Sequence, residues 1–471
     1  MGEVYRSVLP ARYASKQMAE LFSDDSRYKT WRKLWVSLAR AESRLGLPIT
    51  EDQVTELEQN IEPIDYECAA RREAEVHHDV MAHVFAFGKA APGAAGIIHL
   101  GATSCYVTDN ADLILYRDAL EILRDRLIKL IAILCRFSKT YSNTPVLGYT
   151  HYQPAQPVTV GKRACLWIQD LKSDLDEMDF VLKNFCFLGC RGTTGTEASF
   201  MELFGGDTGR IDEMNRMIAR DFGFSRCFPI SSQTYPRKVD VRIMNCLSSL
   251  AQSMYRMATD IRLMQHDRIL EEPFSDGQIG SSAMAYKRNP IRCERICSLS
   301  RFIMTDAFNA VQTASSQWLE RTLDDSANRR LSMPEGFLAA DAILMLGAFI
   351  ASGLRVNVGM AVRSVEEQLP FIATEDILME GVKRGGDRQA LHEVIRRCSM
   401  EASEAMRNGE KYDLIDRLAK ETCFRMTEEE MRSILDPGRF TGRAEEQTLG
   451  YLKELEALTE GVDLMVEDIG A

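Results

Sequence analysis

The chain has 471 residues, of which 45% are hydrophobic and 27% charged, with a formal net charge of −12 at pH 7. This length allows about three domains and a substantial buried core. The excess of acidic residues argues against nonspecific nucleic-acid binding, because affinity for the phosphate backbone depends on surplus lysine and arginine. Twelve cysteines without a C-x-x-C pair, and no N-terminal signal peptide, indicate reduced thiols and a cytoplasmic location.

Near the N-terminus, Arg12 and Tyr13 precede any convincing helix. The arginine is able to bind phosphate, although a surface position is the default expectation for such a pair. Five of the seven histidines follow in the first third of the chain, and two of them directly precede Asp79. The string from His77 to His83 has no H-E-x-x-H spacing and no second cluster to complete a ligand set, so we expect no metal there.

Long apolar seams with helical period dominate the middle of the chain. A turn of small residues, Gly101 to Ser104, comes shortly before them and either caps a helix or presents hydroxyls to a ligand. Seams of this length predict long helices packed nearly parallel or antiparallel, as in a bundle. The seams are Leu113, Tyr116, Leu120, Leu123, Leu127, Leu130, Leu134 and Phe137, then Ile243, Leu247, Leu250, Met254, Met257, Ile261 and Met264.

A proline-rich segment from Pro145 to Pro157 is predicted to be a loop that contains His151. Its prolines restrict the backbone, and a fixed imidazole with a pKa near neutrality suits general acid catalysis. A lone histidine is more often a packing residue, so both interpretations stand at this point.

The segment from Gly277 to Arg295 joins two serines, Ser281 and Ser282, to a dense cationic run. Its glycines give backbone freedom and its serines supply hydroxyls. Its local net charge is plus three, from Lys287, Arg288, Arg292 and Arg295 against Glu294. Pro290 fits the first position of a helix with Asn289 as its N-cap, which would place a positive helix end beside the loop. The alternative is a solvated connection between helices.

Between Arg321 and Arg330, three arginines are separated by polar residues. Guanidinium groups are able to fork onto carboxylate or phosphate oxygens, and Ser326 adds a donor. The alternative is pairing of these arginines with Asp324 and Asp325 on a solvated turn.

The longest apolar stretch runs from Phe337 to Leu354 and is interrupted by Asp341. We expect a buried helix rather than a membrane span, because core helices of a bundle are also apolar all round. From about residue 357 the helical patterns become shorter and more polar. The expected fold is all-α with three helical domains, residues 1–103, 104–356 and 357–471, of which the second is a central long-helix bundle.

Taken together, these segments resemble animal-type adenylosuccinate lyases of the fumarase/aspartase superfamily, over nearly the whole chain. The Ser281 loop resembles the superfamily's GSSxMPxKxN loop, with Ala285 where many members carry proline, a change that should loosen the loop slightly. The other matching strings are Arg12-Tyr13, His78 to His83, Ile98 to Cys105, Thr150 to Gln156, Gly192 to Thr196, Gln233 to Tyr235 and Arg321 to Arg330.

The resemblance implies a homotetramer whose central bundles assemble into a core and whose active sites draw residues from three chains. It implies cleavage of adenylosuccinate to AMP and fumarate, and of SAICAR to AICAR and fumarate, without metal or cofactor. The partners it implies are small purine substrates and other copies of the chain, with no nucleic acid and no membrane.

The resemblance also implies roles for individual residues. Ser281 would be the base, Lys287 the cation that stabilises its alkoxide and the substrate carboxylate, and His151 the acid for the departing nitrogen. Glu294 would orient or tune an imidazole, and His78 would bind or polarise the substrate. His77 stands where relatives often carry arginine. The implied substrate-binding set is Arg12, Tyr13, His77, His78, Asp79, Thr103, Ser104, Thr150, Gln233, Lys287, Asn289, Arg295, Arg321, Ser326 and Arg330.

Two alternatives remain open at this stage. Another fumarate-releasing lyase, such as argininosuccinate lyase, fumarase or aspartase, would share the Ser281 loop, although Arg12-Tyr13 and the arginine string favour a phosphorylated purine. A structural relative without catalysis is the second alternative. The joint presence of Ser281, His151, Lys287 and Glu294 argues against it.

Overall fold

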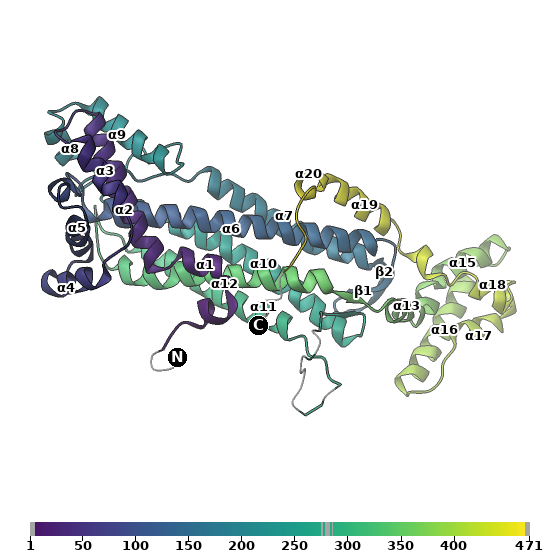
Figure 1. Cartoon of the computed structure of the whole chain (residues 1–471). Coiled ribbons are helices and arrows are strands. Elements are labelled where there is room, and N and C mark those ends of the chain that lie inside the picture. The colour runs from purple at the N-terminus through teal and green to yellow at the C-terminus, as the bar shows by residue number, and fades with distance from the viewer. Residues whose placement is uncertain (1–4, 275–276, 278–282, 285, 467–471) are drawn as a thin grey trace.

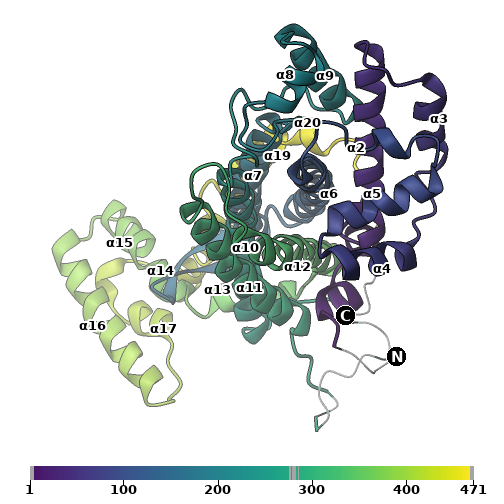
Figure 2. The ribbon, with the colours of Figure 1, turned by 90° about the vertical axis from the view of Figure 1, so that its left-hand side faces the viewer.

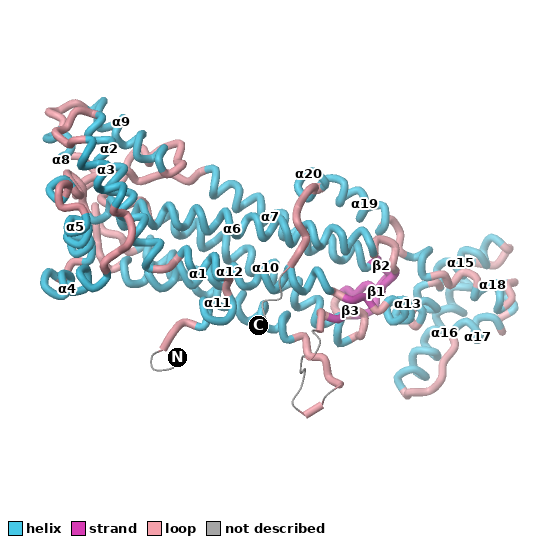
Figure 3. Tube along the Cα trace, viewed as in Figure 1, coloured by secondary structure: helices cyan, strands magenta, loops and turns pink. Residues whose placement is uncertain are grey.

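A computed structural model describes residues 5–274, 277, 283–284 and 286–466. The molecule is elongated and almost entirely helical (Figure 1), so the all-α prediction is confirmed. Within these residues the strands form two antiparallel pairs, which are coloured magenta where visible in Figure 3. The pairs are β1 (Pro145–Thr150) with β2 (Gln153–Thr159), and β3 (Leu270–Glu271) with β4 (Arg355–Val356).

The middle of the molecule is a bundle of long helices, as the apolar seams predicted. Every residue of both seams is buried, with no more than 7% of its surface exposed. The seams lie on two different helices, and burial of so many large apolar side chains along each one stabilises the bundle. The bundle helices are α6 (Ser104–Thr140), α7 (Val160–Lys183), α10 (Lys238–His266), α11 (Ile291–Ser315) and α12 (Asp325–Gly353).

The predicted apolar stretch lies in α12. Among the described helices, α12 alone is long and apolar enough to cross a membrane, and 78% of its most apolar window is buried inside the protein. Gly347 lets neighbouring helices approach closely, since a Cβ there would lie 2.4 Å from Met254 Cε. Asp341 is fully buried and accepts hydrogen bonds from Arg126 and from the backbone of Ser15, which explains how α12 tolerates a carboxylate.

One end of the bundle is covered by the N-terminal helices and by two short helices that follow α7 (Figure 1). Their core contains large aromatic side chains, including Trp31, Trp35 and Phe87. The elements at this end are α2 (Asp24–Arg44), α3 (Glu51–Gln59), α4 (Tyr66–Val76), α5 (Asp79–Ala90), η2 (Ala95–Ile97), α8 (Ala198–Leu203) and α9 (Thr208–Asp221). The first two elements of the chain, η1 (Leu9–Tyr13) and α1 (Lys16–Leu21), lie along the side of the bundle and contact α12 (Figure 1).

The opposite end carries the β1–β2 hairpin and a group of short helices. The hairpin corrects the prediction of a loop from Pro145 to Pro157, because Val146 and Leu147 supply a buried strand face despite the prolines. The short helices have a core of their own, around Leu391, Leu418 and Phe424. They are α13 (Val358–Glu366), α14 (Leu369–Ile372), α15 (Thr374–Lys383), α16 (Arg388–Arg407), α17 (Leu414–Ala419), η3 (Thr422–Phe424), α18 (Glu428–Arg432) and η4 (Pro437–Phe440).

After these helices the chain returns to the bundle. Helices α19 (Ala444–Glu454) and α20 (Glu456–Thr459) pack on α7 and α6, and Leu455 belongs to the bundle core. The predicted range 357–471 therefore contains both a separate core and a segment that joins the central one. The three domain ranges themselves stay a prediction.

A buried carboxyl group in α2 has no hydrogen-bond partner among the described residues. Glu42 is 0% exposed, and both of its carboxyl oxygens lack a donor. Burial raises the pKa of Glu42 to about 9, because an ionised carboxylate is poorly solvated in this core. The folded protein therefore keeps this proton at neutral pH, whereas the unfolded chain loses it above its ordinary pKa of 4.5.

We expect Glu42→Gln to stabilise the protein, and the gain should grow with pH. The folded pKa lies above the unfolded one, so stability is lost as pH rises from about 4.5 to about 9, and an amide abolishes this loss. The gain in unfolding free energy should be small at pH 5 and roughly 3 kcal/mol at pH 7. Denaturant unfolding at pH 5, 7 and 8 measures it, with exposed Glu202→Gln as the control. A gain that does not change with pH would contradict an ionisable buried Glu42.

Candidate active site

A pocket of about 550 Å³ lies at the end of the bundle where several helices begin. Figure 2 views the molecule from this end. Within the described residues, the pocket wall includes the first turns of four helices, α5, α6, α10 and α12, or the residues just before them. The N-terminus of a helix carries free N–H groups and the positive end of the dipole, so these starts favour an anionic ligand.

Eight of the residues predicted to form the site line this pocket. They come from segments that are far apart in the sequence and that the fold brings together. The turn before α5, the start of α6, the segment before α10 and the start of α12 contribute them. The eight are His77, His78, Asp79, Ser104, Gln233, Arg321, Ser326 and Arg330.

His78 is placed by the tight connection between α4 and α5. His77 takes a left-handed conformation, with φ of 53°, which turns the chain so that His78 becomes the N-cap of α5. The His78 Nδ1 accepts a hydrogen bond from the Met81 backbone N–H at 3.4 Å, and its Nε2 lies 3.3 Å from Ser104 Oγ. In the neutral imidazole the proton is then on Nε2, which makes this nitrogen a donor beside the pocket.

Two other histidines near the pocket are packing groups. His83 stacks on Tyr28 with 3.8 Å between ring centroids, and His99 accepts a 2.9 Å hydrogen bond from Trp35 Nε1. Burial lowers the pKa of both His83 and His99 to about 4, so they are neutral at physiological pH. They support the pocket wall from behind rather than titrate in it.

The arginines between 321 and 330 are paired with carboxylates in the folded chain. Arg321 Nη1 lies 2.8 Å from Asp325, so the pairing within this string occurs, but Asp325 is buried at the start of α12 and not on the solvated turn that the alternative predicted. Arg330 Nη2 lies 2.8 Å from a different partner, Asp79 on α5. These guanidinium groups line the pocket, but part of their charge is already balanced.

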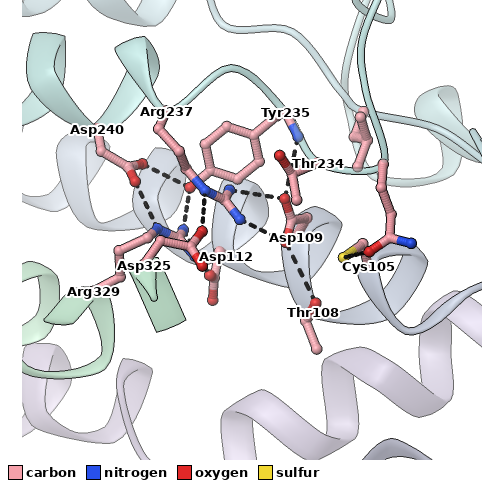
Figure 4. Close-up of polar contacts among 12 residues, drawn as sticks. Cys105, Thr108, Asp109, Asp112, Thr234, Tyr235, Arg237, Asp240, Asp325 and Arg329 are labelled. Atoms are coloured by element: carbon pink, nitrogen blue, oxygen red, sulfur yellow. Dashed lines mark hydrogen bonds and ion pairs between the residues drawn. The ribbon is translucent and has the colours of Figure 1, made fainter. Parts of the chain in front are cut away.

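Beneath the pocket lies a buried ion pair network that sequence reasoning missed (Figure 4). Arg237 lies immediately before α10 and is 3% exposed. Its Nε is 2.6 Å from Asp325 at the start of α12, and its Nη1 is 2.8 Å from Asp109 on α6. Burial acts to lower the pKa of Arg237, but Asp109 in particular more than compensates, and the net shift is upward. The guanidinium therefore stays charged.

A second arginine extends this network. Arg329 Nε lies 2.7 Å from Asp240 and its Nη2 lies 2.9 Å from Asp112. The Tyr235 hydroxyl donates to Asp240 at 2.6 Å and also contacts Arg329. Arg329 and Tyr235 belong to strings that the family resemblance used, but Arg237, Asp109 and Asp240 carried no sequence signal that distinguished them from surface charges.

Three further predicted residues lie outside the lining of the pocket. Thr103 is the N-cap of α6, although its side chain makes no capping hydrogen bond. Arg12 and Tyr13 lie in η1, which packs on α12, with the Arg12 guanidinium 5.8 Å from the Tyr13 ring centroid. They are absent from the lining of the pocket in one chain.

The other predicted residues that the structure describes lie at the opposite end of the bundle. Thr150 and His151 are in the β1–β2 hairpin, and Lys287 and Asn289 precede α11. The Arg288 carbonyl accepts a 3.0 Å hydrogen bond from Gln265, in the last turn of α10, whereas the first turn of α10 adjoins the pocket. A helix of 29 residues is about 43 Å long, so one chain does not bring Lys287 to the pocket.

Helix α11 begins one residue later than predicted. Pro290, not Asn289, is its N-cap, so that prediction was wrong. Glu272 takes over the capping role, since its carboxylate accepts hydrogen bonds from the backbone N–H groups of Arg292 and Cys293 at 3.1 and 3.0 Å. Predicted site residues Glu294 and Arg295 lie in the first turn and a half of this helix.

Some predictions concern residues outside the described ranges. Ser281, the predicted base, is one of them, as are Ser282 and Ala285. Among the residues that are described, no group of three or more His, Cys, Asp or Glu side chains is arranged to hold a metal ion.

Comparison with known proteins identifies the family. A model of the lyase family matches residues 13–305, and one described as adenylosuccinate lyase C-terminus matches residues 370–449. The adenylosuccinate lyase of Saccharomyces cerevisiae is 47% identical over 96% of this chain and 94% of its own length. That of Schizosaccharomyces pombe is 46% identical over the same shares, and that of Schistosoma mansoni is 44% identical, also over these shares.

Solved structures agree in fold. A fumarate lyase from Mesorhizobium sp. BNC1 superposes with a TM-score of 0.80 at 23% identity, covering 96% of this chain and 100% of that one. A 3-carboxy-cis,cis-muconate lactonizing enzyme from Pseudomonas putida gives 0.84 at 22% identity, over the same shares. Identities this low support the fold alone, whereas the full-length relatives carry the family assignment. The chain belongs to the adenylosuccinate lyase family.

Proposed function

We propose that this lyase eliminates fumarate from adenylosuccinate to give AMP, and from SAICAR to give AICAR, in purine nucleotide biosynthesis. The observation that carries the proposal is the pocket at the helix starts, which eight of the predicted site residues line. The full-length similarity to adenylosuccinate lyases supports the same reaction. We also propose a cytoplasmic location, because the twelve cysteines contain no C-x-x-C pair and none is in a disulfide.

The charge of the pocket suits such a substrate, which carries a phosphate and two carboxylates. Of the described side chains that line it, five are arginines and four are aspartate or glutamate, a difference of one positive charge. Side chains alone therefore give a weak field for a ligand with several negative charges. The helix starts add to it, since each carries a partial positive charge of roughly half a unit. An aspartate in the first turn offsets part of this charge in α5, α10 and α12, whereas the first turn of α6 has no acidic residue.

Elimination needs a base, an acid and a stabilising cation. The base removes a proton from the carbon beside a carboxylate, the freed electron pair forms the double bond of fumarate, and the bond to the purine nitrogen breaks. We assign the base to Ser281, stabilisation of the aci-carboxylate to Lys287, and protonation of the departing nitrogen to His151. Glu294 would orient an imidazole. His78, with its Nε2 proton beside Ser104, would bind or polarise the substrate.

The remaining assignments concern substrate binding. A ligand in the pocket would meet hydroxyl, amide and guanidinium donors from several helices, and groups at other positions would join when copies of the chain assemble. The proposed set is Arg12, Tyr13, His77, Asp79, Thr103, Ser104, Thr150, Gln233, Asn289, Arg295, Arg321, Ser326 and Arg330.

We propose that the active form is a homotetramer with shared sites. One chain leaves His151 and Lys287 at the end of the bundle away from the pocket, so a second and a third copy would supply them. Exposed apolar side chains on one side of α11 support this assembly, since Phe308 is 67% exposed and Val311, three residues later, is 39% exposed. Trp318 and Leu319, which follow α11, and Leu331 on α12 are also exposed.

Purified protein should consume adenylosuccinate, with a fall in the absorbance of the substrate and release of AMP and fumarate. SAICAR should be cleaved in the same assay. Argininosuccinate is the control substrate and should not react. Turnover of argininosuccinate without turnover of adenylosuccinate would overturn the proposed function.

Ser281→Ala should abolish elimination and leave assembly intact. Loss of a general base lowers the rate by roughly 10²- to 10⁴-fold, while a hydroxyl-to-hydrogen change in one loop leaves the helical core untouched. Steady-state kinetics measures the rate and light scattering the mass. Ser282→Ala is the matched control, and near-normal turnover by Ser281→Ala would remove Ser281 from the role of base.

Mixing inactive variants tests whether sites are shared. If one chain supplies Ser281 and another His151, then unfolding and refolding equal amounts of Ser281→Ala and His151→Ala chains should restore about a quarter of the sites. Each variant refolded alone is the control. A mixture no more active than either parent would contradict shared sites.

A further inference from the structure

Arg27 lies in the first turns of α2 and lines the pocket with a partly buried side chain. The other arginines of the lining, as far as the chain is described, are all held by carboxylates: Arg237, Arg321, Arg329 and Arg330. The Arg27 side chain makes no ion pair or hydrogen bond with any described residue. We infer that Arg27 binds an anionic oxygen of the substrate, an inference that rests on the proposed function.

Helix stability does not explain an arginine at this position. A cation in the first turns of a helix faces the positive end of the dipole, which is an unfavourable placement. Asp24 lies three residues earlier and would be a natural partner on the helix surface, yet the two side chains form no ion pair within the described structure. Asp25 is engaged elsewhere, by the Tyr66 hydroxyl and by Lys29 at 3.9 Å.

Arg27 shares the pocket with a carboxylate that another arginine already binds. Arg27 and Asp112 line the same pocket. Burial raises the pKa of Asp112, and Arg329 and Arg27 act in the opposite direction. Asp112 is already paired with Arg329 at 2.9 Å. Arg27 therefore lines the pocket without an ion pair to any carboxylate among the described residues.

An unpaired guanidinium differs from a paired one in what it offers a ligand. A paired arginine has to share its N–H donors with the protein's own carboxylate, whereas Arg27 keeps all five donors and its whole charge. Phosphate and carboxylate oxygens bind guanidinium in the same way, so the shared chemistry is an anionic oxygen. AMP and fumarate separate the two sources, because the first carries only the phosphate and the second only carboxylates.

The test compares Arg27→Gln with Arg44→Gln, which removes an exposed arginine from the far end of the same helix. Loss of a charge-assisted contact should raise the KM for adenylosuccinate by about 10- to 100-fold and leave kcat within about threefold. The inhibition constant of AMP should rise by a similar factor if Arg27 holds the phosphate, and that of fumarate if it holds a carboxylate. Arg27→Lys should recover part of the loss. Arg44→Gln should match the wild type, and all three variants should keep its thermal midpoint.

Two results overturn the inference, and they are distinguishable. If wild-type protein cleaves adenylosuccinate and Arg27→Gln has the KM and both inhibition constants of Arg44→Gln, Arg27 has no part in binding and the proposed function stands. If the wild type neither cleaves adenylosuccinate nor binds AMP by calorimetry, the proposed function and the role of Arg27 fail together.

Discussion

The Arg237 guanidinium joins the beginnings of three bundle helices. It lies immediately before α10 and binds Asp109 on α6 and Asp325 on α12, and all three side chains are almost fully buried. Taking these charges out of water is expensive, so the network contributes little net stability, but leaving any one of them unpaired would cost several kcal/mol. The pairing therefore fixes how the three helix starts sit relative to one another. The shape of the pocket depends on this arrangement, because residues at these helix starts form part of its wall.

The fixed helix starts also determine which positive groups in the pocket are available to an anionic ligand. The lining side chains nearly cancel one another, and the arginines beside the buried network are committed to the protein's own carboxylates. What remains to attract an anion is the dipoles of the helix starts, above all that of α6, whose first turn has no acidic residue, together with Arg27. A site of this kind is preorganised, because its dipoles are held by the fold before any ligand arrives.

The sequence predicted those features that depend on local period or on long matching strings. The apolar seams on α6 and α10 predicted the helix bundle, because 3.6-residue periodicity is a property of each helix alone. The resemblance named the residues around His78 and Arg321, but it did not tell which share a pocket within one chain. Asp109 and Arg237 are 128 residues apart, and no local pattern reports a pair that only the packing of two helices creates. Arg27 was missed for the same reason.

The return of the chain to the bundle has a consequence for the small core near Leu391 and Phe424. That unit is attached to the central part of the protein at both of its ends. At one end α13 packs on β1, and at the other end α19 packs on α7. A unit connected to the rest of the protein at one point can rotate in any direction. A unit connected at two points can rotate only about the axis through those points. The helices from α14 to α18 thus form an insert in the bundle rather than a tail, and one of their two attachments, through α13, is to the hairpin that carries His151.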